Sequence, residues 1–367
     1  MDYIDFNTQF HFLPPRYKII DLIGIGSYGE VYRGYDYKLN RNIAIKNLYL
    51  KRMNILQVLR EILILKHTKH INIIELYDVA YIPEQDMLLL IMTYMQTDLM
   101  RIINSPESLN SLSDMHMQRI IFQILRALKY LHSANIIHRD LKPSNILINE
   151  NCEIKICDFG MSRLILNNNS THLTEYVVTR FYRAPELLLG AKTYNEKVDI
   201  WSVGCTFAEL LGQKHLFEAK DHMKQIDKII TLLGTPSEDD KWWVTLPEAK
   251  SYLNKKELLH LQPIPLETVI PYNKNPLALD LLKQMLMFDP NKRITIDAAI
   301  NHAYLKELTH DIDNPLYEGS INMDFEKDNN NNEIYKLHIS TMHFNIFLCS
   351  NTFMYKKISN FFTMISI

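Results

Sequence analysis

The chain has 367 residues, of which 47% are hydrophobic, and its formal net charge is −2. This length and apolar content suit two compact domains or one domain with two lobes. The nearly balanced charge excludes nucleic acid or an anionic membrane as a partner recognised through bulk charge. The four cysteines show no Cys-x-x-Cys spacing, the 14 histidines show no metal-ligand spacing, and no secretory signal opens the chain. We therefore expect reduced thiols in a cytoplasmic and nuclear protein.

The first part of the chain is predicted to be rich in strands. The N-terminal segment at 1–16 has a mixed composition and contains two prolines, Pro14 and Pro15, near its end. The run ILQVLREILILK at 55–66 has apolar residues at helical spacing and predicts a helix. A nearly continuous apolar run at 86–94 predicts a buried strand. Shorter strand-like runs, punctuated by glycine, are found at 17–23, 31–35 and 42–45.

After about Met95 the pattern changes to helices. Apolar residues at helical spacing predict helices at 117–132, 199–211, 222–233 and 277–287. We therefore predict an α+β, bilobal protein. Its domain at 17–305 divides into a small β-rich lobe, a hinge and a larger helical lobe, at 17–92, 93–97 and 98–305.

The end of the chain has a different composition. We distinguish a C-terminal extension at 306–333 from a divergent tail at 334–367, which has no clear period. A stretch at 337–355 lacks charged residues and approaches membrane-spanning length. Its His, Asn, Ser and Thr residues argue against a transmembrane helix. The role of the tail is left open.

Three glycines between two strand-like runs form a candidate phosphate-binding loop. Glycine lets backbone amides approach phosphate oxygens closely. The pattern G-x-G-x-x-G alone could also be a dinucleotide-binding turn or a plain hairpin. A dinucleotide-binding turn opens onto a helix, however, and here a strand-like run follows. We predict that a nucleotide contacts these loop residues: Gly24, Ile25, Gly26, Ser27, Tyr28, Gly29 and Val31.

A lysine ends the short apolar run Ile43-Ala44-Ile45-Lys46. Taken alone, Lys46 would be an exposed residue at a strand edge. Its distance from the glycine loop favours a catalytic role, in which an ion pair with Glu61 on the next helix orients the phosphates of ATP. Ala44 is predicted to line the same nucleotide site.

The loop His138-Arg139-Asp140-Leu141-Lys142-Pro143-Ser144-Asn145 carries the chemistry, together with Asp158-Phe159-Gly160. Asp140 can accept a proton from a substrate hydroxyl, and Lys142 can meet phosphate charge. Asn145 and Asp158 can hold Mg²⁺. Each acidic residue alone would more often be a surface charge, but their order after the glycine loop and Lys46 makes coincidence improbable. The sequence therefore predicts phosphoryl transfer from ATP with Mg²⁺ as a cofactor.

Further residues indicate the acceptor and the support of this loop. Lys142 follows Asp140 by two residues, as in kinases that act on Ser and Thr. Thr179 lies five residues before Ala184, where such kinases have a threonine that bonds to the catalytic Asp and Lys. Two interactions are predicted to be structural: a buried ion pair between Glu186 and Arg293, and the support of the catalytic-loop backbone by Asp199.

At this point the chain resembles the mitogen-activated protein kinases of the extracellular-signal-regulated type, in the CMGC group, over about 17–305. The triplet Thr174-Glu175-Tyr176, between Asp158-Phe159-Gly160 and Ala184-Pro185-Glu186, carries the resemblance. It implies phosphorylation of Thr174 and Tyr176 by an upstream dual-specificity kinase, and protein substrates with Ser/Thr-Pro sites. Two alternatives fit less well. A pseudokinase scaffold should lack Lys46, Asp140 or Asp158, and a cyclin-dependent kinase should lack the tyrosine of the triplet.

The resemblance also implies how the switch works. A phosphate on Thr174 would meet Arg60, Arg139 and Arg163, and one on Tyr176 would meet Arg180 and Arg183. Each arginine by itself would be an ordinary surface charge. Met92 is implied at the back of the adenine pocket, with Thr93 and Met95 in the hinge; Met92 can equally be a core residue.

Asp311 and Asp313 resemble the acidic patch with which this family binds basic-hydrophobic docking peptides and phosphatases. The match is looser than elsewhere, and two exposed aspartates are common by chance. After about His338 the likeness ends. The tail is either specific to a lineage or an artefact of gene prediction, such as translated intron.

Overall fold

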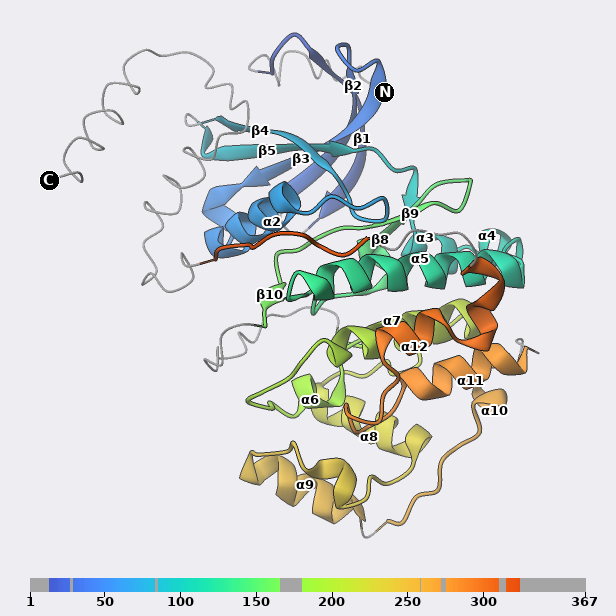
Figure 1. Cartoon of the computed structure of the whole chain (residues 1–367). Helices are drawn as coiled ribbons and strands as arrows, with labels where there is room; N and C mark the ends of the chain where they lie inside the picture. The colour runs from blue at the N-terminus through green and yellow to red at the C-terminus, as the bar shows by residue number, and fades with distance from the viewer. Residues whose placement is uncertain are drawn as a thin grey trace, which may run out of the picture. The chain divides into compact units, whose positions relative to one another are not determined.

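The computed structural model describes residues 13–26, 29–82, 85–165, 180–257, 259–271, 275–309 and 315–323. The chain divides into two compact units, whose elements are labelled in Figure 1. Among the described residues, the first unit comprises those up to Lys66 and the segment Glu75–Tyr94. The second unit comprises His67–Ile74 and the residues from Met95 to Met323.

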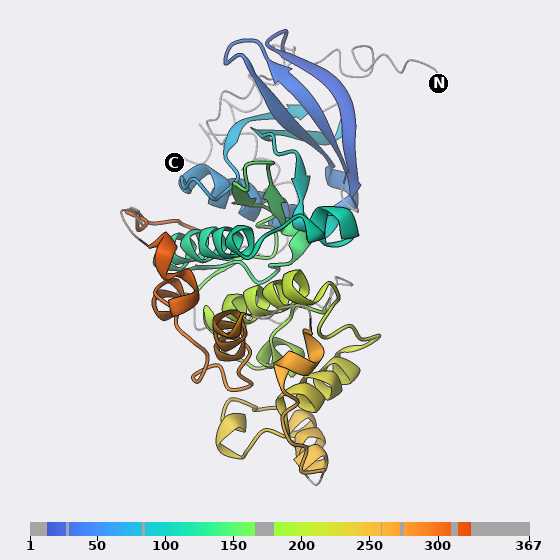
Figure 2. The same cartoon turned by 90° about the vertical axis from the view of Figure 1, so that its right-hand side faces the viewer.

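The first unit is built on an antiparallel five-stranded sheet, in the order β1-β2-β3-β5-β4. Its strands are β1 (Tyr17–Gly26), β2 (Gly29–Asp36), β3 (Arg41–Tyr49), β4 (Leu76–Ile82) and β5 (Met87–Thr93). Figure 2 shows the long hairpin of β1 and β2. The core of this sheet is formed by aromatic and branched residues, among them Tyr17, Tyr32, Ile43 and Ile45.

The predicted strands are confirmed, although the structure extends β1 to β3 beyond the predicted ends. Strand β5 is buried at every residue except Thr93, as its apolar run predicts. Strand β4 was missed by the sequence analysis. The reason is Asp78, which is buried in the strand and accepts a hydrogen bond from the Tyr17 hydroxyl at 3.0 Å. A buried carboxylate interrupts the apolar pattern that would have revealed the strand.

Helix α2 (Ile55–His67) confirms the helix predicted at 55–66. Its buried residues include Val58, Leu59 and Ile62, which recur at helical spacing. The charged residues Arg60 and Glu61 are also buried on this helix. Because a buried charge is costly without partners, these two residues mark a functional part of the helix.

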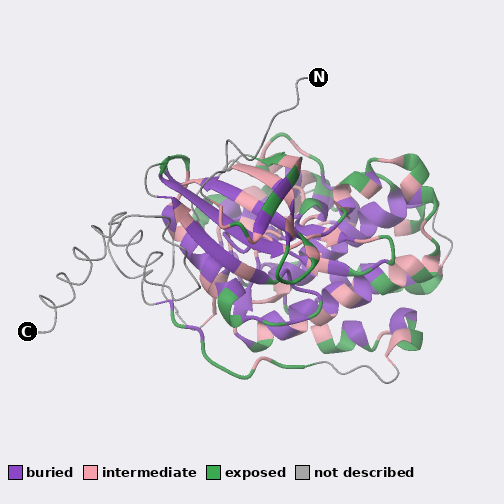
Figure 3. Cartoon of the chain, turned by 90° about the horizontal axis from the view of Figure 1, so that it is seen from above, coloured by how far each residue is buried: buried purple, intermediate pink, exposed green. Residues whose placement is uncertain are grey.

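The second unit is helical, and Figure 3 shows buried and exposed residues alternating along its helices. Its α-helices are α3 (Leu99–Ile103), α4 (Pro106–Asn110), α5 (Asp114–Ser133), α6 (Pro185–Leu188), α7 (Lys197–Gly212), α8 (His222–Leu233), α9 (Pro247–Glu257), α10 (Leu266–Val269), α11 (Pro276–Met285) and α12 (Ile296–Ile300). Among the described residues, the 3-10 helices with defined bounds are η1 (Leu50–Arg52), η3 (Pro143–Asn145), η4 (Asp239–Lys241) and η5 (Ala303–Leu308).

The four helices predicted in this part of the chain are present. Helix α8 has the predicted bounds, whereas α11 ends at Met285, two residues earlier than predicted. Helix α7 is buried along its whole length except at Lys197. A helix that is buried on all sides lies in the interior, so α7 is part of the core of the second unit.

Short strands in the second unit hold the catalytic loop. Strands β8 (Ile146–Ile148) and β9 (Ile154–Ile156) form a hairpin, with β6 (Thr97–Asp98) along one edge. Strand β7 (Ile136–Ile137) pairs with β10 (Arg163–Leu164). The loop at 138–145 therefore lies between β7 and β8. Each of these strands is paired with another strand, and this pairing restricts the backbone at both ends of the loop.

The described part of the C-terminal extension packs on helix α5. The Tyr317 N–H donates to Ser133 Oγ at 2.8 Å, and its ring meets the Tyr130 ring edge-on at 5.8 Å. Ile321 and Met323 are buried. Within the described ranges, no helix is long and apolar enough to cross a membrane. The uncharged stretch at 337–355 lies outside these ranges.

Candidate active site

The predicted ion pair of the first unit is confirmed. Lys46 lies on β3, and its Nζ is 2.7 Å from Oε1 and 3.0 Å from Oε2 of Glu61 on α2. The Lys46 side chain is 21% exposed, and that of Glu61 is 6% exposed. The pair therefore holds an ammonium group in a fixed place that solvent still reaches, as a phosphate-binding lysine requires.

The glycine loop is a hairpin between two strands. Gly24 is opposite Val31, and Gly26 is opposite Gly29. A Cβ on Gly29 would lie 1.7 Å from the backbone oxygen of Asn47, so no side chain fits there. The strand after the loop shows that the dinucleotide-binding alternative is wrong. Ser27 and Tyr28 lie outside the described residues.

The other predicted nucleotide contacts are divided between the two units. Ala44 and Met92 are opposite each other on β3 and β5, and both are buried. Thr93 is half-buried, with its Oγ1 2.9 Å from the Tyr77 hydroxyl. Met95 is buried in the second unit. Met92 is thus a core residue, which was one of the two roles considered for it. Its contact with adenine stays a prediction.

The catalytic loop of the second unit is held together by its own side chains. Lys142 Nζ lies 2.7 Å from Asp140 Oδ2. Asn145 Nδ2 donates to the Asp140 backbone oxygen at 2.8 Å and to Oδ2 at 3.2 Å. The structure therefore brings two of the predicted residues, Lys142 and Asn145, together on the carboxylate of Asp140.

The electrostatics of this loop favour a bound cation. Burial raises the pKa of the Asp140 carboxyl, Lys142 lowers it, and the nearby Asp158 carboxylate raises it. Asn145 uses its amide nitrogen on Asp140, and in the described part of the chain no hydrogen bond engages its amide oxygen. That oxygen and the Asp158 carboxylate are the ligand type that Mg²⁺ prefers, so the residues fit this ion.

The backbone of the catalytic loop is supported by Asp199, as predicted. Its two carboxylate oxygens accept the N–H of His138 at 2.9 Å and the N–H of Arg139 at 2.8 Å. Arg139 has a φ of 68°, a strained conformation for a residue with a side chain. These two hydrogen bonds stabilise that conformation and so orient the neighbouring Asp140.

His132 completes this support, and the sequence analysis missed it. Its Nε2 lies 2.9 Å from Asp199 Oδ2. Although burial acts to raise the pKa of Asp199, the His132 hydrogen bond and charge and the backbone N–H of Arg139 hold it below its ordinary value. His132 lies near the end of α5, far from Asp199 in the sequence, so no local pattern connects them.

Arg183, one of the predicted phosphate-binding arginines, is affected by the charges of two others in the second unit, Arg139 and Arg180. Burial lowers the pKa of Arg183; Asp140 raises it, and the charges of Arg180 and Arg139 lower it again. Arg139 also stacks on the Tyr194 ring at 5.3 Å, and its buried Nε has no hydrogen-bond partner among the described residues. The charges of Arg139 and Arg180 thus act against that of Arg183, and a bound anion would offset this effect.

The remaining switch residues are placed separately. Arg163 Nη1 donates to the Ser162 backbone oxygen at 2.9 Å in the second unit, and Arg60 is buried on α2 in the first. That one phosphate joins Arg60, Arg139 and Arg163 stays a prediction. The positions outside the described residues are Thr174, Tyr176, Thr179, Asp311 and Asp313.

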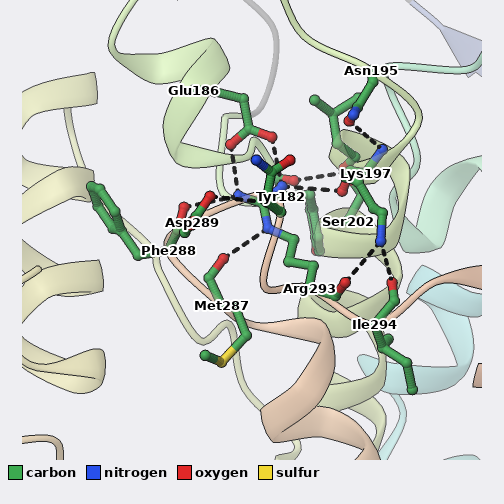
Figure 4. Close-up of polar contacts among 12 residues, drawn as sticks. Tyr182, Glu186, Asn195, Lys197, Ser202, Met287, Phe288, Asp289, Arg293 and Ile294 are labelled. Atoms are coloured by element: carbon green, nitrogen blue, oxygen red, sulfur yellow. Dashed lines mark hydrogen bonds and ion pairs between the residues drawn. The ribbon is translucent and has the colours of Figure 1, made fainter. Parts of the chain in front are cut away.

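The predicted ion pair between Glu186 and Arg293 holds the triplet Ala184-Pro185-Glu186 in place. Arg293 Nη1 and Nη2 lie 2.5 and 2.7 Å from the two carboxylate oxygens of Glu186 (Figure 4). Arg293 Nε also donates to the Met287 backbone oxygen at 2.7 Å. Lys197, which the sequence analysis missed, donates to the Arg293 backbone oxygen at 2.8 Å. The pair is therefore part of a buried, fully bonded network.

Comparison with known proteins agrees with this geometry. Residues 17–305 match the family model of the protein kinase domain. Mitogen-activated protein kinase 13 of Arabidopsis thaliana is 42% identical over 328 residues, which are 88% of this chain and 87% of the relative. Mitogen-activated protein kinase 3 of the same plant is 45% identical over 311 residues, 83% and 82% of the two chains. Extracellular signal-regulated kinase 1 of Dictyostelium discoideum is 40% identical over 342 residues, 92% of this chain and 63% of the relative.

Proposed function

This chain belongs to the mitogen-activated protein kinases, and from that premise we propose which residues carry its activity and its regulation. It is a serine/threonine protein kinase of signal transduction. One observation carries the proposal for the chemistry: Asp140 is hydrogen-bonded to both Lys142 and Asn145 in a loop whose backbone Asp199 supports.

Asp140 acts as the base that accepts the proton of the substrate hydroxyl. Its burial raises its pKa, and the adjacent Lys142 ammonium lowers it. Lys142 in turn can meet the negative charge of the transferred phosphoryl group. Positioning and electrostatics of this kind supply most of the catalysis in phosphoryl transfer.

ATP is the phosphoryl donor in this proposal, and Mg²⁺ neutralises charge on its phosphates when bound. Asn145 and Asp158 would hold the ion through oxygen atoms. Lys46, held by Glu61, would contact the phosphates, and the glycine loop would approach them with its backbone amides. The acceptor is Ser or Thr followed by Pro, and Thr179 would bond to Asp140 and Lys142.

Regulation rests on Thr174 and Tyr176. A phosphate on Tyr176 would bind Arg180 and Arg183, and one on Thr174 would bind Arg139 together with Arg60 and Arg163. The effect of the Arg139 and Arg180 charges on Arg183 supports this, because a bound phosphate would offset it. An upstream dual-specificity kinase, docking peptides, phosphatases, and activity in the cytoplasm and nucleus complete the proposal.

Kinase assays after activation test this proposal. The wild-type protein is incubated with a constitutively active dual-specificity kinase and then assayed on a Ser-Pro peptide, with mass spectrometry of Thr174 and Tyr176. Thr174→Ala with Tyr176→Phe should leave activity at the unphosphorylated level, about hundredfold below the activated protein. Ser170→Ala, in the same segment, is the matched control and should be activated normally. Full activation of the double variant would refute the switch.

A further inference from the structure

A cavity of about 610 Å³ lies in the helical unit, away from the residues proposed for catalysis. It is lined by the end of α8, the following segment up to Asp240, the segment 263–267, and helix α11 with the residues after it. Most of its lining is apolar, including Pro236, Leu279 and Phe288. This volume is in the range of cavities that bind ligands of drug or short-peptide size.

The walls of this cavity are held in place by the backbone. Ile264 N–H donates to the Leu232 oxygen at 2.8 Å, and Thr235 N–H donates to the Leu261 oxygen at 3.0 Å. The backbone oxygens of Met287 and Phe288, which also line the cavity, accept from Arg293 at 2.7 and 3.3 Å, and Figure 4 shows the Met287 bond. A preformed cavity costs little conformational entropy when a ligand binds.

The charges around the cavity are mainly negative. Four carboxylates and one ammonium, Lys283, belong to its lining. Asp240 is paired with Lys292 at 2.7 Å, and Asp280 lies 3.0 Å from His302 Nε2. Glu267 is exposed and has no ion pair or hydrogen bond within the described ranges. Asp280 and Glu267 are the carboxylates that a basic ligand would meet.

Two exposed apolar side chains accompany this acidic surface. Trp242 is 58% exposed, and its indole N–H donates to Asp289, a lining residue, at 3.0 Å. Ile264 in the wall is 39% exposed. An exposed tryptophan fixed by a hydrogen bond is typical of the residues that dominate binding between proteins. The surface thus combines an apolar hollow, an aromatic side chain and negative charge.

We propose that this cavity is a docking site for a segment of a partner protein that carries apolar side chains next to Lys or Arg. The apolar side chains enter the hollow between the prolines and α11, and the basic residues pair with Glu267 and Asp280. Charge complementarity decides the class of partner, because the same carboxylates repel acidic peptides and the headgroups of anionic lipids. The proposal goes beyond the kinase activity, and direct binding tests it without catalysis.

A peptide of leucines flanked by lysines, labelled with fluorescein, is titrated with the full chain and followed by fluorescence anisotropy. Glu267→Lys with Asp280→Lys should weaken binding about tenfold, since two pairs become repulsive. Ile264→Asp should weaken it to a similar extent. The matched control reverses two exposed acidic residues elsewhere in the same unit, Glu107→Lys with Glu318→Lys, and should leave the affinity unchanged.

Tryptophan emission locates the peptide independently. The unlabelled peptide should change the emission of the wild-type protein, and this change should be absent in Trp242→Phe. Circular dichroism of every variant shows that it has folded.

Several results would overturn the proposal. One is equal binding of a peptide with glutamates in place of the lysines. Another is an equal loss in the control variant, which would indicate attraction by bulk charge. Loss of binding only in Asp311→Lys with Asp313→Lys would assign the peptide to the acidic patch of the C-terminal extension. A wild-type dimer that the peptide dissociates would assign the cavity to a second copy of the chain.

Discussion

The two units of the chain each contain an ion pair that the sequence predicted, and the two pairs differ in burial. In the sheet unit the Lys46 side chain is 21% exposed, whereas in the helical unit Arg293 is fully buried against Glu186. Arg293 also donates to the backbone oxygens of Met287 and Phe288. The partly exposed pair of Lys46 and Glu61 keeps a charge available to a ligand, and the fully buried pair of Arg293 and Glu186 holds the fold together.

The physical reason lies in the cost of burying charge. Two ions removed from water are stable only if their geometry is good and their remaining donors are satisfied. Arg293 meets this condition because its planar guanidinium group binds both carboxylate oxygens of Glu186, and its remaining N–H groups donate to backbone oxygens. Lys46 is a compact charge on a flexible stem, which suits a group that has to meet phosphate. We therefore expect changes in the first pair to alter activity and changes in the second to alter stability.

Arg293→Met should have the largest effect on stability. The substitution leaves Glu186 buried without its partner, so unfolding free energy should fall by about 3–5 kcal/mol. Denaturant unfolding of the purified protein measures it. The double variant Glu186→Gln with Arg293→Met should recover part of the loss, because the uncompensated charge is gone. A single variant as stable as the wild type would show that the pair is not structural.

Glu61→Gln should mainly reduce activity. Without its carboxylate, Lys46 is no longer held, and kcat/KM of the activated kinase should fall about hundredfold. The unfolding free energy should change by less than about 1 kcal/mol, since Lys46 still reaches water. Glu75→Gln, an exposed residue of the same unit, is the matched control. A loss of stability as large as that in Arg293→Met would remove the distinction between the two pairs.

Lys142→Met should shift the pH dependence of the reaction, which is the smallest effect of the three. Asp140 must be ionised to accept a proton, so kcat falls as the pH drops through its pKa. Burial raises that pKa and Lys142 lowers it, so removing Lys142 raises it further. The acidic limb of the kcat profile should therefore move to higher pH.

Lys142→Arg keeps the positive charge beside Asp140. It should leave the acidic limb of the profile where it is in the wild-type enzyme. An unchanged limb in Lys142→Met would show that another group is the base.

The sequence alone predicted the two-unit fold class and the residues around Asp140. These predictions rest on patterns that are local in the chain: helical periodicity, a glycine loop between strands, and a catalytic loop of eight residues. Local patterns also placed Lys46 and Glu61 on a strand and a helix, and the structure confirms that they pair at 2.7 Å. The proposed roles of Thr174 and Tyr176 rest on the sequence as well.

The tertiary structure decided what depends on residues far apart in the chain. Strand β4 was hidden by Asp78, which is stable in the core because Tyr17 binds it. The support of Asp199 by His132 and the cavity beside α11 leave no periodic or spaced signal, since their members come from separate elements. Sequence patterns report on which surfaces a segment can bury. The packing of those segments decides which polar groups are satisfied, how exposed each ion pair is, and where an acidic hollow is left open to a partner.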